Sequence, residues 1–185
     1  MNPIFLIVGF PAAGKSSTSK ALMAQFSKGL HIPVDDFRNM VVSGLLLPGP
    51  DWSQGLVEQI SLARESAIQM ALNYQRAGFA VALDDFVDPH RLKEYEGFRE
   101  QTKVHKLILM PSQTQAHRRN LKRASQGGAG NDQGREYIDE GIRIGYQTFG
   151  HLISQLEAEG WWALDNSGLS LEQTVQTILK HFGYK

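Results

Sequence analysis

Apolar and polar positions along the chain follow two alternating patterns. Short, continuously apolar runs, which are typical of parallel strands buried on both faces of a sheet, lie at residues 4–8, 30–34, 79–83, 104–110 and 161–164. Between them, apolar residues recur every three or four positions, which is the period of an amphipathic helix. This second pattern predicts helices over residues 15–26, 56–76, 112–125, 135–159 and from 170 onwards.

The alternation of strands and helices predicts an α/β fold with a parallel sheet and helices on both faces, because strand–helix–strand units are right-handed. We expect one domain over residues 1–185, since the chain shows no internal repeat and no linker. Two segments depart from the regular pattern, the turn-rich loop 43–55 and the glycine-rich break 126–131. A loop as long as 43–55 is usually functional or mobile. We therefore expect a lid around 112–134 and an acceptor-side loop and helix around 36–77.

Composition excludes several classes of protein. The 19 Lys and Arg residues balance 19 Asp and Glu residues, so neither nucleic acid nor an anionic membrane is an expected partner. The absence of cysteine excludes disulfides, zinc–thiolate sites and a thiol nucleophile. The apolar run Ile4–Phe10 is too short to span a membrane and lacks the preceding cationic segment of a signal peptide. We expect a cytoplasmic protein.

Residues 9–16, with the sequence GFPAAGKS, match the phosphate-loop pattern G-x-x-x-x-G-K-[ST] in full. Glycines let the backbone point several N–H groups at one anion, and the following helix adds its positive N-terminal dipole. We expect Lys15 to reach the β- and γ-phosphates of ATP and the Ser16 hydroxyl to bind Mg²⁺. A chance match is disfavoured, because the motif lies between a buried-type strand and a helix. The predicted nucleotide-binding residues of this segment are Gly9, Pro11, Ala12, Ala13, Gly14, Lys15, Ser16 and Ser17.

Pairs of acidic residues follow the second and third predicted strands, where ligands of parallel sheets gather. Asp84 follows an apolar strand in the manner of a Walker B carboxylate, which would hold Mg²⁺ directly or through water. The alternative is an acid that only forms a turn. We interpret Ser16 and Asp84 as metal ligands and Asp85 as a substrate contact.

Asp35 is the candidate catalytic base. Transfer of a phosphoryl group to a hydroxyl needs a base that orients the hydroxyl and accepts its proton. We favour Asp35 over Asp36, although either acid could instead cap the following helix. Arg38 is either a contact for an anionic substrate or a solvated helix charge, and Trp52 in the 43–55 loop is a further candidate substrate contact.

Arg119 and Arg123 lie four residues apart and therefore share one face of a basic helix. Positioned arginines stabilise the charge of a transferring phosphoryl group, and a glycine-rich hinge could close them over ATP. The alternatives are a solvated basic face and a nucleic-acid patch, but no aromatic residue interleaves with these charges to stack on bases. The turn Asp165-Asn166-Ser167 after the fifth strand could frame the adenine, or form a plain turn with a helix cap.

Together these motifs resemble those of the P-loop small-molecule and nucleotide kinases. The layout is most similar to the chloramphenicol phosphotransferase and zeta-toxin-like branch, with gluconate and shikimate kinases as more distant relatives. Residues 34–38 resemble the stretch that carries the catalytic base in that branch, and residues 119–123 resemble the lid of gluconate-type kinases. The resemblance implies a five-stranded parallel sheet in the order 2-3-1-4-5 between helices. It also implies Mg²⁺-dependent phosphoryl transfer from ATP.

The resemblance leaves the acceptor open among metabolites, nucleotide sugars and antibiotics that carry a hydroxyl group. The lid lacks the downstream motif of nucleoside monophosphate kinases, so a mononucleotide acceptor is not expected. A GTPase is excluded, because residues 84–87 do not match D-x-x-G and the chain contains no N-K-x-D motif. Two alternatives keep the nucleotide site: a regulatory ATPase or switch module, and a polynucleotide 5′-hydroxyl kinase.

Overall fold

The computed structural model describes residues 2–47, 52–86, 95–98, 103–125, 132–149 and 153–184. Five parallel strands form one sheet in the order β2-β3-β1-β4-β5. The strands are β1 (Ile4–Gly9), β2 (Gly29–Pro33), β3 (Ala80–Phe86), β4 (Val104–Leu109) and β5 (Trp161–Leu164). The predicted α/β class and the sheet order implied by the resemblance are both confirmed.

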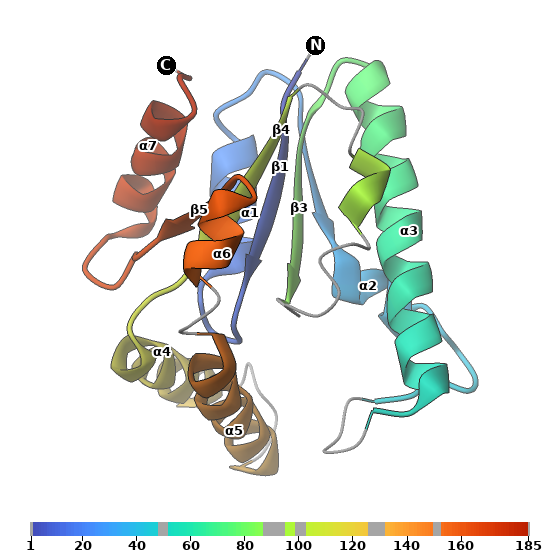
Figure 1. Ribbon diagram of the computed structural model, residues 1–185, viewed down its shortest axis with the longest axis vertical. Coiled ribbons are helices and arrows are strands. Elements are labelled where there is room, and N and C mark those ends of the chain that lie inside the picture. Colours follow the sequence, from blue (N-terminus) through green and yellow to red (C-terminus); the bar gives the residue numbers. More distant parts are fainter. Residues whose placement is uncertain are drawn as a thin grey trace.

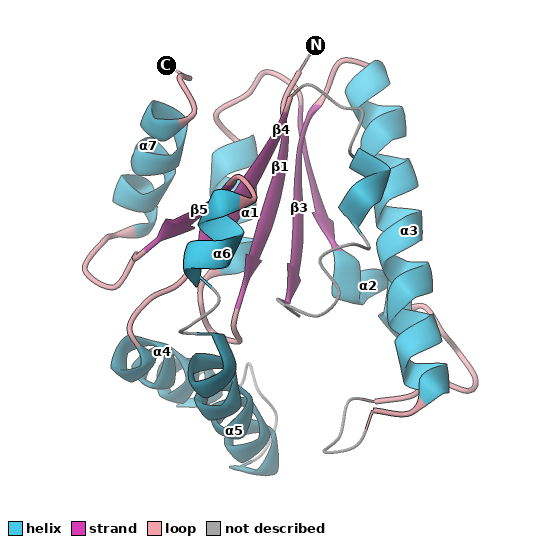
Figure 2. Cartoon of the chain, in the orientation of Figure 1, coloured by secondary structure: helices cyan, strands magenta, loops and turns pink. Residues whose placement is uncertain are grey.

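Helices cover both faces of the sheet and its carboxyl-terminal edge (Figure 1). They are α1 (Lys15–Met23), α2 (Val34–Asn39), α3 (Gln54–Arg76), α4 (Gln113–Ser125), α5 (Asp132–Phe149), α6 (Ile153–Ala158) and α7 (Leu171–His181). Helices α1 and α7 lie on one face, whereas α3 and α6 lie on the other (Figure 2). Helices α4 and α5 lie beyond the ends of the strands, at the bottom of the view. None of the described helices is long and apolar enough to cross a bilayer.

The central strand β1 is buried along its whole length, because strands flank both of its edges and helices cover both of its faces. Its side chains alternate between two cores. Ile4, Leu6 and Val8 pack with residues of α3 and α6. Phe5 and Ile7 pack with residues of α1 and α7. The continuous apolar pattern that predicted a buried strand therefore serves two separate hydrophobic layers.

The register of the strands brings their carboxyl ends together beside the phosphate loop. Gly9, the last residue of β1, pairs with Phe86 of β3 and with Leu109 of β4. A Cβ atom on Gly9 would lie 2.5 Å from the carbonyl oxygen of Leu109. Only glycine fits this approach of two backbones, which explains why the loop begins with that residue.

Two features of the helices differ from the sequence prediction. The single helix expected over 135–159 is two helices: α5 packs against α4, and α6 packs against β5. A short helix, α2, also begins directly at the end of β2, earlier than the sequence pattern indicated. The predicted hinge at 126–131 lies outside the described residues.

Candidate active site

The phosphate loop joins β1 to α1. Gly14 at the N-cap of α1 has φ 95°, and Ala12 has φ 60°, so both lie in the left-handed region. Such a conformation is strained for alanine and is typical of functional loops. The Nζ atom of Lys15 donates to the carbonyl of Phe10 at 3.0 Å, which curls the loop around its lysine. Ser16 and Ser17 are exposed at the start of α1, as a phosphate-binding helix terminus requires.

Carboxylates surround Lys15. Burial lowers the pKa of Lys15, and the carboxylates of Asp84 and Asp35 act on it in the opposite direction. A smaller effect of the same sign comes from Asp85. The structure therefore brings the acids of two strand ends into electrostatic range of the phosphate-loop lysine.

Asp84 lies at the end of β3 on the face covered by α1, and only 5% of it is exposed. The Ser16 hydroxyl lies 3.4 Å from its Oδ1 atom. A hydroxyl and a carboxylate are hard oxygen donors of the kind that Mg²⁺ prefers. The described residues contain no group of three or more His, Cys, Asp or Glu side chains that could hold a metal ion by themselves. Ser16 and Asp84 thus fit the ion, and their assignment as ligands stays a prediction.

Asp35 and Asp36 lie in the first turn of α2, and both are exposed. Pro33 occupies the N-cap of this helix without a side-chain cap bond, so neither acid caps it. Of the two, Asp35 acts on the pKa of both Lys15 and Asp85, which places its charge toward the phosphate loop. The assignment of Asp35 as the base stays a prediction.

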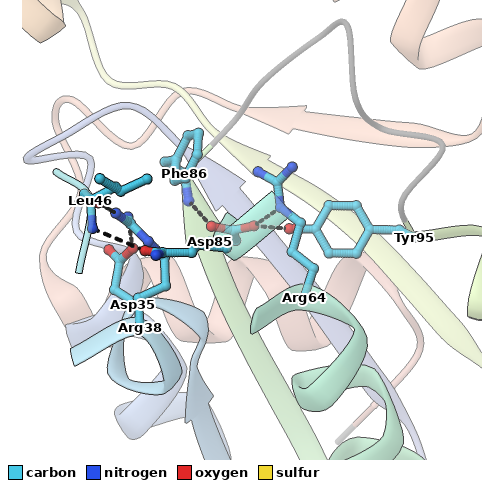
Figure 3. A network of polar contacts seen from close by, with 8 residues as sticks. Asp35, Arg38, Leu46, Arg64, Asp85, Phe86 and Tyr95 are labelled. Atoms are coloured by element: carbon cyan, nitrogen blue, oxygen red, sulfur yellow. Dashed lines mark hydrogen bonds and ion pairs between the residues drawn. The ribbon is translucent and has the colours of Figure 1, made fainter. Parts of the chain in front are cut away.

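Arg38 is buried rather than solvated, which corrects one of the two predictions for this residue. Its Nη2 atom donates to the carbonyl of Leu46 at 2.8 Å, and its Nη1 atom lies 3.9 Å from Asp35 Oδ1 (Figure 3). Gln59 of α3 holds the same loop through two hydrogen bonds. Its side-chain amide donates to the carbonyl of Gly44 and accepts from the N–H of Leu46. Arg38 therefore links the 43–47 loop to Asp35, and its contact with an anionic substrate stays a prediction.

Asp85 faces the opposite side of β3 from Asp84, which corrects its prediction as a substrate contact. Its side chain is fully enclosed, and its Oδ2 atom accepts from Arg64 Nε at 2.6 Å and from the hydroxyl of Tyr95. Figure 3 shows this network at the end of β3. Burial raises the pKa of Asp85, although Arg64 and Tyr95 act to lower it. The carboxylate anchors α3 and the 95–98 turn instead of facing the open site.

Aromatic side chains cover this anchor on its outer side. The Arg64 guanidinium lies 4.9 Å from the ring centre of Phe86 and 5.5 Å from that of Tyr95. Trp52 packs edge-on against Phe86 at 6.0 Å and remains 41% exposed. Trp52 therefore lies beside the end of β3, and its contact with a substrate stays a prediction.

Arg119 of α4 contacts two distant segments. Its Nη1 atom donates to the carbonyl of Ala13 at 3.0 Å, and its Nη2 atom donates to the carbonyl of Asn166 at 2.8 Å. The buried Asn166 amide also donates to Ala13, at 3.1 Å. Burial lowers the pKa of Arg119, while Tyr146 and Asp165 act to raise it. The structure thus brings together the phosphate loop, helix α4 and the turn after β5.

Arg123 is exposed one turn further along α4, and its charge acts on the pKa of Lys15. Within the turn after β5, the Asp165 carboxylate accepts from the backbone N–H of Ser167 at 2.8 Å. The Ser167 hydroxyl in turn accepts from the N–H of Ser112 at 2.6 Å. This turn has the bonds of an ordinary Asx turn, and its contact with adenine stays a prediction.

Helix α5 braces the phosphate loop, which no sequence pattern indicated. The rings of Tyr146 and Phe10 lie 4.7 Å apart. Gly145 packs so closely on Phe10 that a Cβ atom would lie 2.4 Å from its ring. Gly141, one turn earlier, faces Pro11 at an ordinary distance. The conformation of the loop therefore depends on this helix as well as on its own glycines.

Two buried groups also escaped prediction, although the sequence carried a signal for each. Arg64 continues the four-residue spacing of Leu56 and Ile60, so a charge lies on the apolar face of α3. His31 lies within β2 and contacts Asp84. A charged or titratable residue at a core-facing position is the signal in both cases.

The chain has a kinase-like P-loop fold, which is a nucleotide-binding fold. The phosphate loop, the sheet order and the carboxylates at the strand ends define it. Residues 4–143 match the family described as AAA domain. This match spans more than half of the chain, and the chain belongs to that family. No curated protein matches the chain in sequence.

Solved structures, including those of two kinases, share the fold along nearly the whole chain. The tunicamycin resistance protein of Deinococcus radiodurans is 17% identical with a TM-score of 0.63, over 100% of this chain and 98% of that one. Shikimate kinase from Acinetobacter baumannii, in complex with shikimate, is 13% identical with a TM-score of 0.63, over 98% and 93%. Thymidylate kinase from Candida albicans is 15% identical with a TM-score of 0.59, over 98% and 91%. At this identity the likeness concerns the fold.

Proposed function

We propose that the protein is an ATP-dependent kinase that transfers the γ-phosphoryl group to a hydroxyl of a small molecule, with Mg²⁺ as cofactor. One observation carries this proposal. The exposed carboxylate of Asp35 lies in electrostatic range of Lys15, on the side of the sheet edge formed by α2 and the 43–47 loop. A site that only binds nucleotide needs Lys15 and the metal-binding carboxylate of Asp84. It does not need a further carboxylate such as that of Asp35.

The phosphate groups of ATP are bound by backbone and side-chain groups of the phosphate loop and of α4. Backbone N–H groups of residues 9–16 and the Lys15 ammonium bind the β- and γ-phosphates. Arg123 adds positive charge beside the oxygens of the transferring phosphoryl group. Arg119 orients the nucleobase of the nucleotide against Asn166. Ser16 and Asp84 would hold Mg²⁺, which neutralises phosphate charge when bound.

Asp35 acts on the acceptor. It orients the hydroxyl, and its carboxylate takes the hydroxyl proton as the oxygen forms a bond to the γ-phosphorus. The bond from the γ-phosphorus to the bridging oxygen breaks, and ADP leaves with that oxygen. Arg38 and the loop that it fastens hold Asp35 in place.

The acceptor is a small molecule of the metabolite, nucleotide-sugar or antibiotic kind. Balanced charge supports this class over a polynucleotide, because nucleic-acid binding depends on an excess of cations. The fold does not identify the acceptor compound, because one fold hosts many functions. An experiment is needed to identify it.

The test is a screen for phosphorylated products. Purified protein is incubated with ATP and Mg²⁺ against pooled hydroxyl-bearing metabolites, nucleotide sugars, antibiotics and oligonucleotides, and every mass gain of one phosphate is recorded. We expect a small-molecule product that disappears with Lys15→Ala. A protein that binds ATP tightly, yields no product and gains a protein partner in the ATP-bound state would contradict the proposal and favour the regulatory switch.

A further inference from the structure

His31 lies beside the magnesium site proposed above, although no motif includes it. It is on β2, and its register partner on β3 is Ala82. Alternate residues of a strand face the same side of a sheet, so His31 shares a face with Ala82 and Asp84. This is the face covered by α1, whose first turn carries Ser16.

The two oxygens of the Asp84 carboxylate have different neighbours. Oδ2 lies 2.5 Å from the Nε2 atom of His31, and Oδ1 lies 3.4 Å from the Ser16 hydroxyl. The side chains of His31 and Asp84 are only 9% and 7% exposed, so little water competes for their contact. One oxygen is thus occupied by the imidazole, while the other is turned toward the start of α1.

We propose that His31 is a positioning residue that holds the Asp84 carboxylate with Oδ1 toward the magnesium position beside Ser16. The inference rests on the proposed function, because it takes Asp84 as a ligand of nucleotide-bound Mg²⁺. The last torsion of an aspartate is broad and roughly two-fold, so an unrestrained carboxylate can rotate. A bond to one oxygen removes that freedom. Partners of this kind are worth about 10- to 100-fold in metal affinity when they are removed.

The experiment measures nucleotide affinity rather than turnover. The dissociation constant of ADP is determined by displacement of a fluorescent nucleotide, once with Mg²⁺ and once with a chelator. In the wild type, Mg²⁺ is expected to tighten ADP binding. His31→Leu is expected to reduce this tightening by about 10-fold or more, while the affinity in the chelator stays unchanged. His31→Gln, whose amide can reach the same oxygen, is expected to retain most of it.

A matched control separates this effect from the general loss of a histidine. His105 of β4 is partly buried and bonds the Tyr184 hydroxyl at 2.8 Å, away from the phosphate loop. His105→Gln is expected to leave both ADP affinities unchanged. Circular dichroism and thermal unfolding report whether each variant is folded. If His31→Leu does not fold, His31→Asn replaces it, because its amide is polar but too short to make the contact.

The outcomes separate the two proposals. A folded His31→Leu or His31→Asn protein with the same Mg²⁺ effect as the wild type overturns the role of His31, while the magnesium site stands. A wild-type protein whose ADP affinity does not respond to Mg²⁺ overturns the magnesium site itself, and with it the role of His31.

Discussion

Asp84 and Asp85 are neighbours in sequence and lie in opposite environments, because side chains of a strand alternate between its two faces. Asp84 faces the start of α1, where it meets Ser16 and His31. Asp85 faces α3, where Arg64 and Tyr95 enclose it. One acid therefore lies beside the phosphate loop, and the other is an internal anchor.

The Arg64–Asp85 pair makes a sharp prediction for stability. Arg64→Met is expected to lower the free energy of unfolding by about 3–5 kcal/mol, since it leaves a buried carboxylate without its cation. Urea denaturation at neutral pH measures this change. Arg76→Met makes the same substitution at an exposed arginine at the end of α3, and its effect is expected to stay within about 0.5 kcal/mol.

The loss in Arg64→Met is expected to depend on pH. Burial raises the pKa of Asp85, so its contribution to stability is fully present below the ordinary pKa of an aspartate and is lost as pH rises through the folded-state value. Without Arg64 this loss grows, so the variant should approach the wild type at acidic pH and fall behind at neutral pH. Equal losses for Arg64→Met and Arg76→Met would contradict the anchor.

At the scale of elements, α5 packs against the phosphate loop at two glycines, Gly145 and Gly141. Only Gly145 is in close contact, so the two positions provide a matched test. Gly145→Ala is expected to displace the Phe10 ring, because its Cβ would lie 2.4 Å away, and to weaken ADP binding and stability by about 1–3 kcal/mol. Gly141→Ala places a Cβ at 3.6 Å from Pro11, an ordinary contact. It is expected to stabilise the helix by up to about 1 kcal/mol.

Thermal unfolding and ADP titration of both variants check this prediction. The two substitutions have the same chemistry on the same helix, so a difference between them reports the contact with Phe10. Unchanged ADP affinity in Gly145→Ala would mean that α5 does not set the conformation of the loop.

Tyr146 belongs to the same helix and gives a prediction at alkaline pH. Burial and the charge of Asp165 raise the pKa of Tyr146 from 10 to about 12, against the opposing charge of Arg119. The stability that its neutral hydroxyl contributes is therefore complete below pH 10 and is lost as pH rises through about 12. Tyr146→Phe is expected to be less sensitive than the wild type over this interval, in urea unfolding at several pH values. Identical pH curves would rule out a contribution from this tyrosine.

At the scale of the whole molecule, the sequence predicted what local patterns and one motif determine. The continuously apolar runs identified the strands. The motif GFPAAGKS identified the phosphate loop, which the structure places at the carboxyl end of β1. The partners of Arg119 could not be predicted, because Ala13 and Asn166 are distant from it in sequence and lie beside it only in the folded chain. We predicted that both Asp84 and Asp85 would face the site, but successive side chains of a strand point to opposite faces of the sheet, so only Asp84 lies beside α1.

The balance of charges over the whole molecule predicts little affinity for nucleic acid. A labelled single-stranded oligonucleotide is expected to show no saturable binding at about 0.15 M salt, where surface charges are screened beyond about 8 Å. Fluorescence anisotropy across a salt series measures this. Binding that weakens steeply as salt rises would instead support the polynucleotide kinase alternative.

The central claim is that Asp35 serves as the base of a phosphoryl transfer at Lys15. The most direct measurement compares the single-turnover rate of Asp35→Asn with that of Asp36→Asn, using the acceptor that the product screen provides. Both acids are exposed in the same helical turn, so they are matched in charge and position. We expect Asp35→Asn to lower the rate by roughly 100- to 10,000-fold without loss of ADP affinity, and Asp36→Asn to retain it. Equal rates for the two variants, or a loss in Asp36→Asn alone, would contradict the claim.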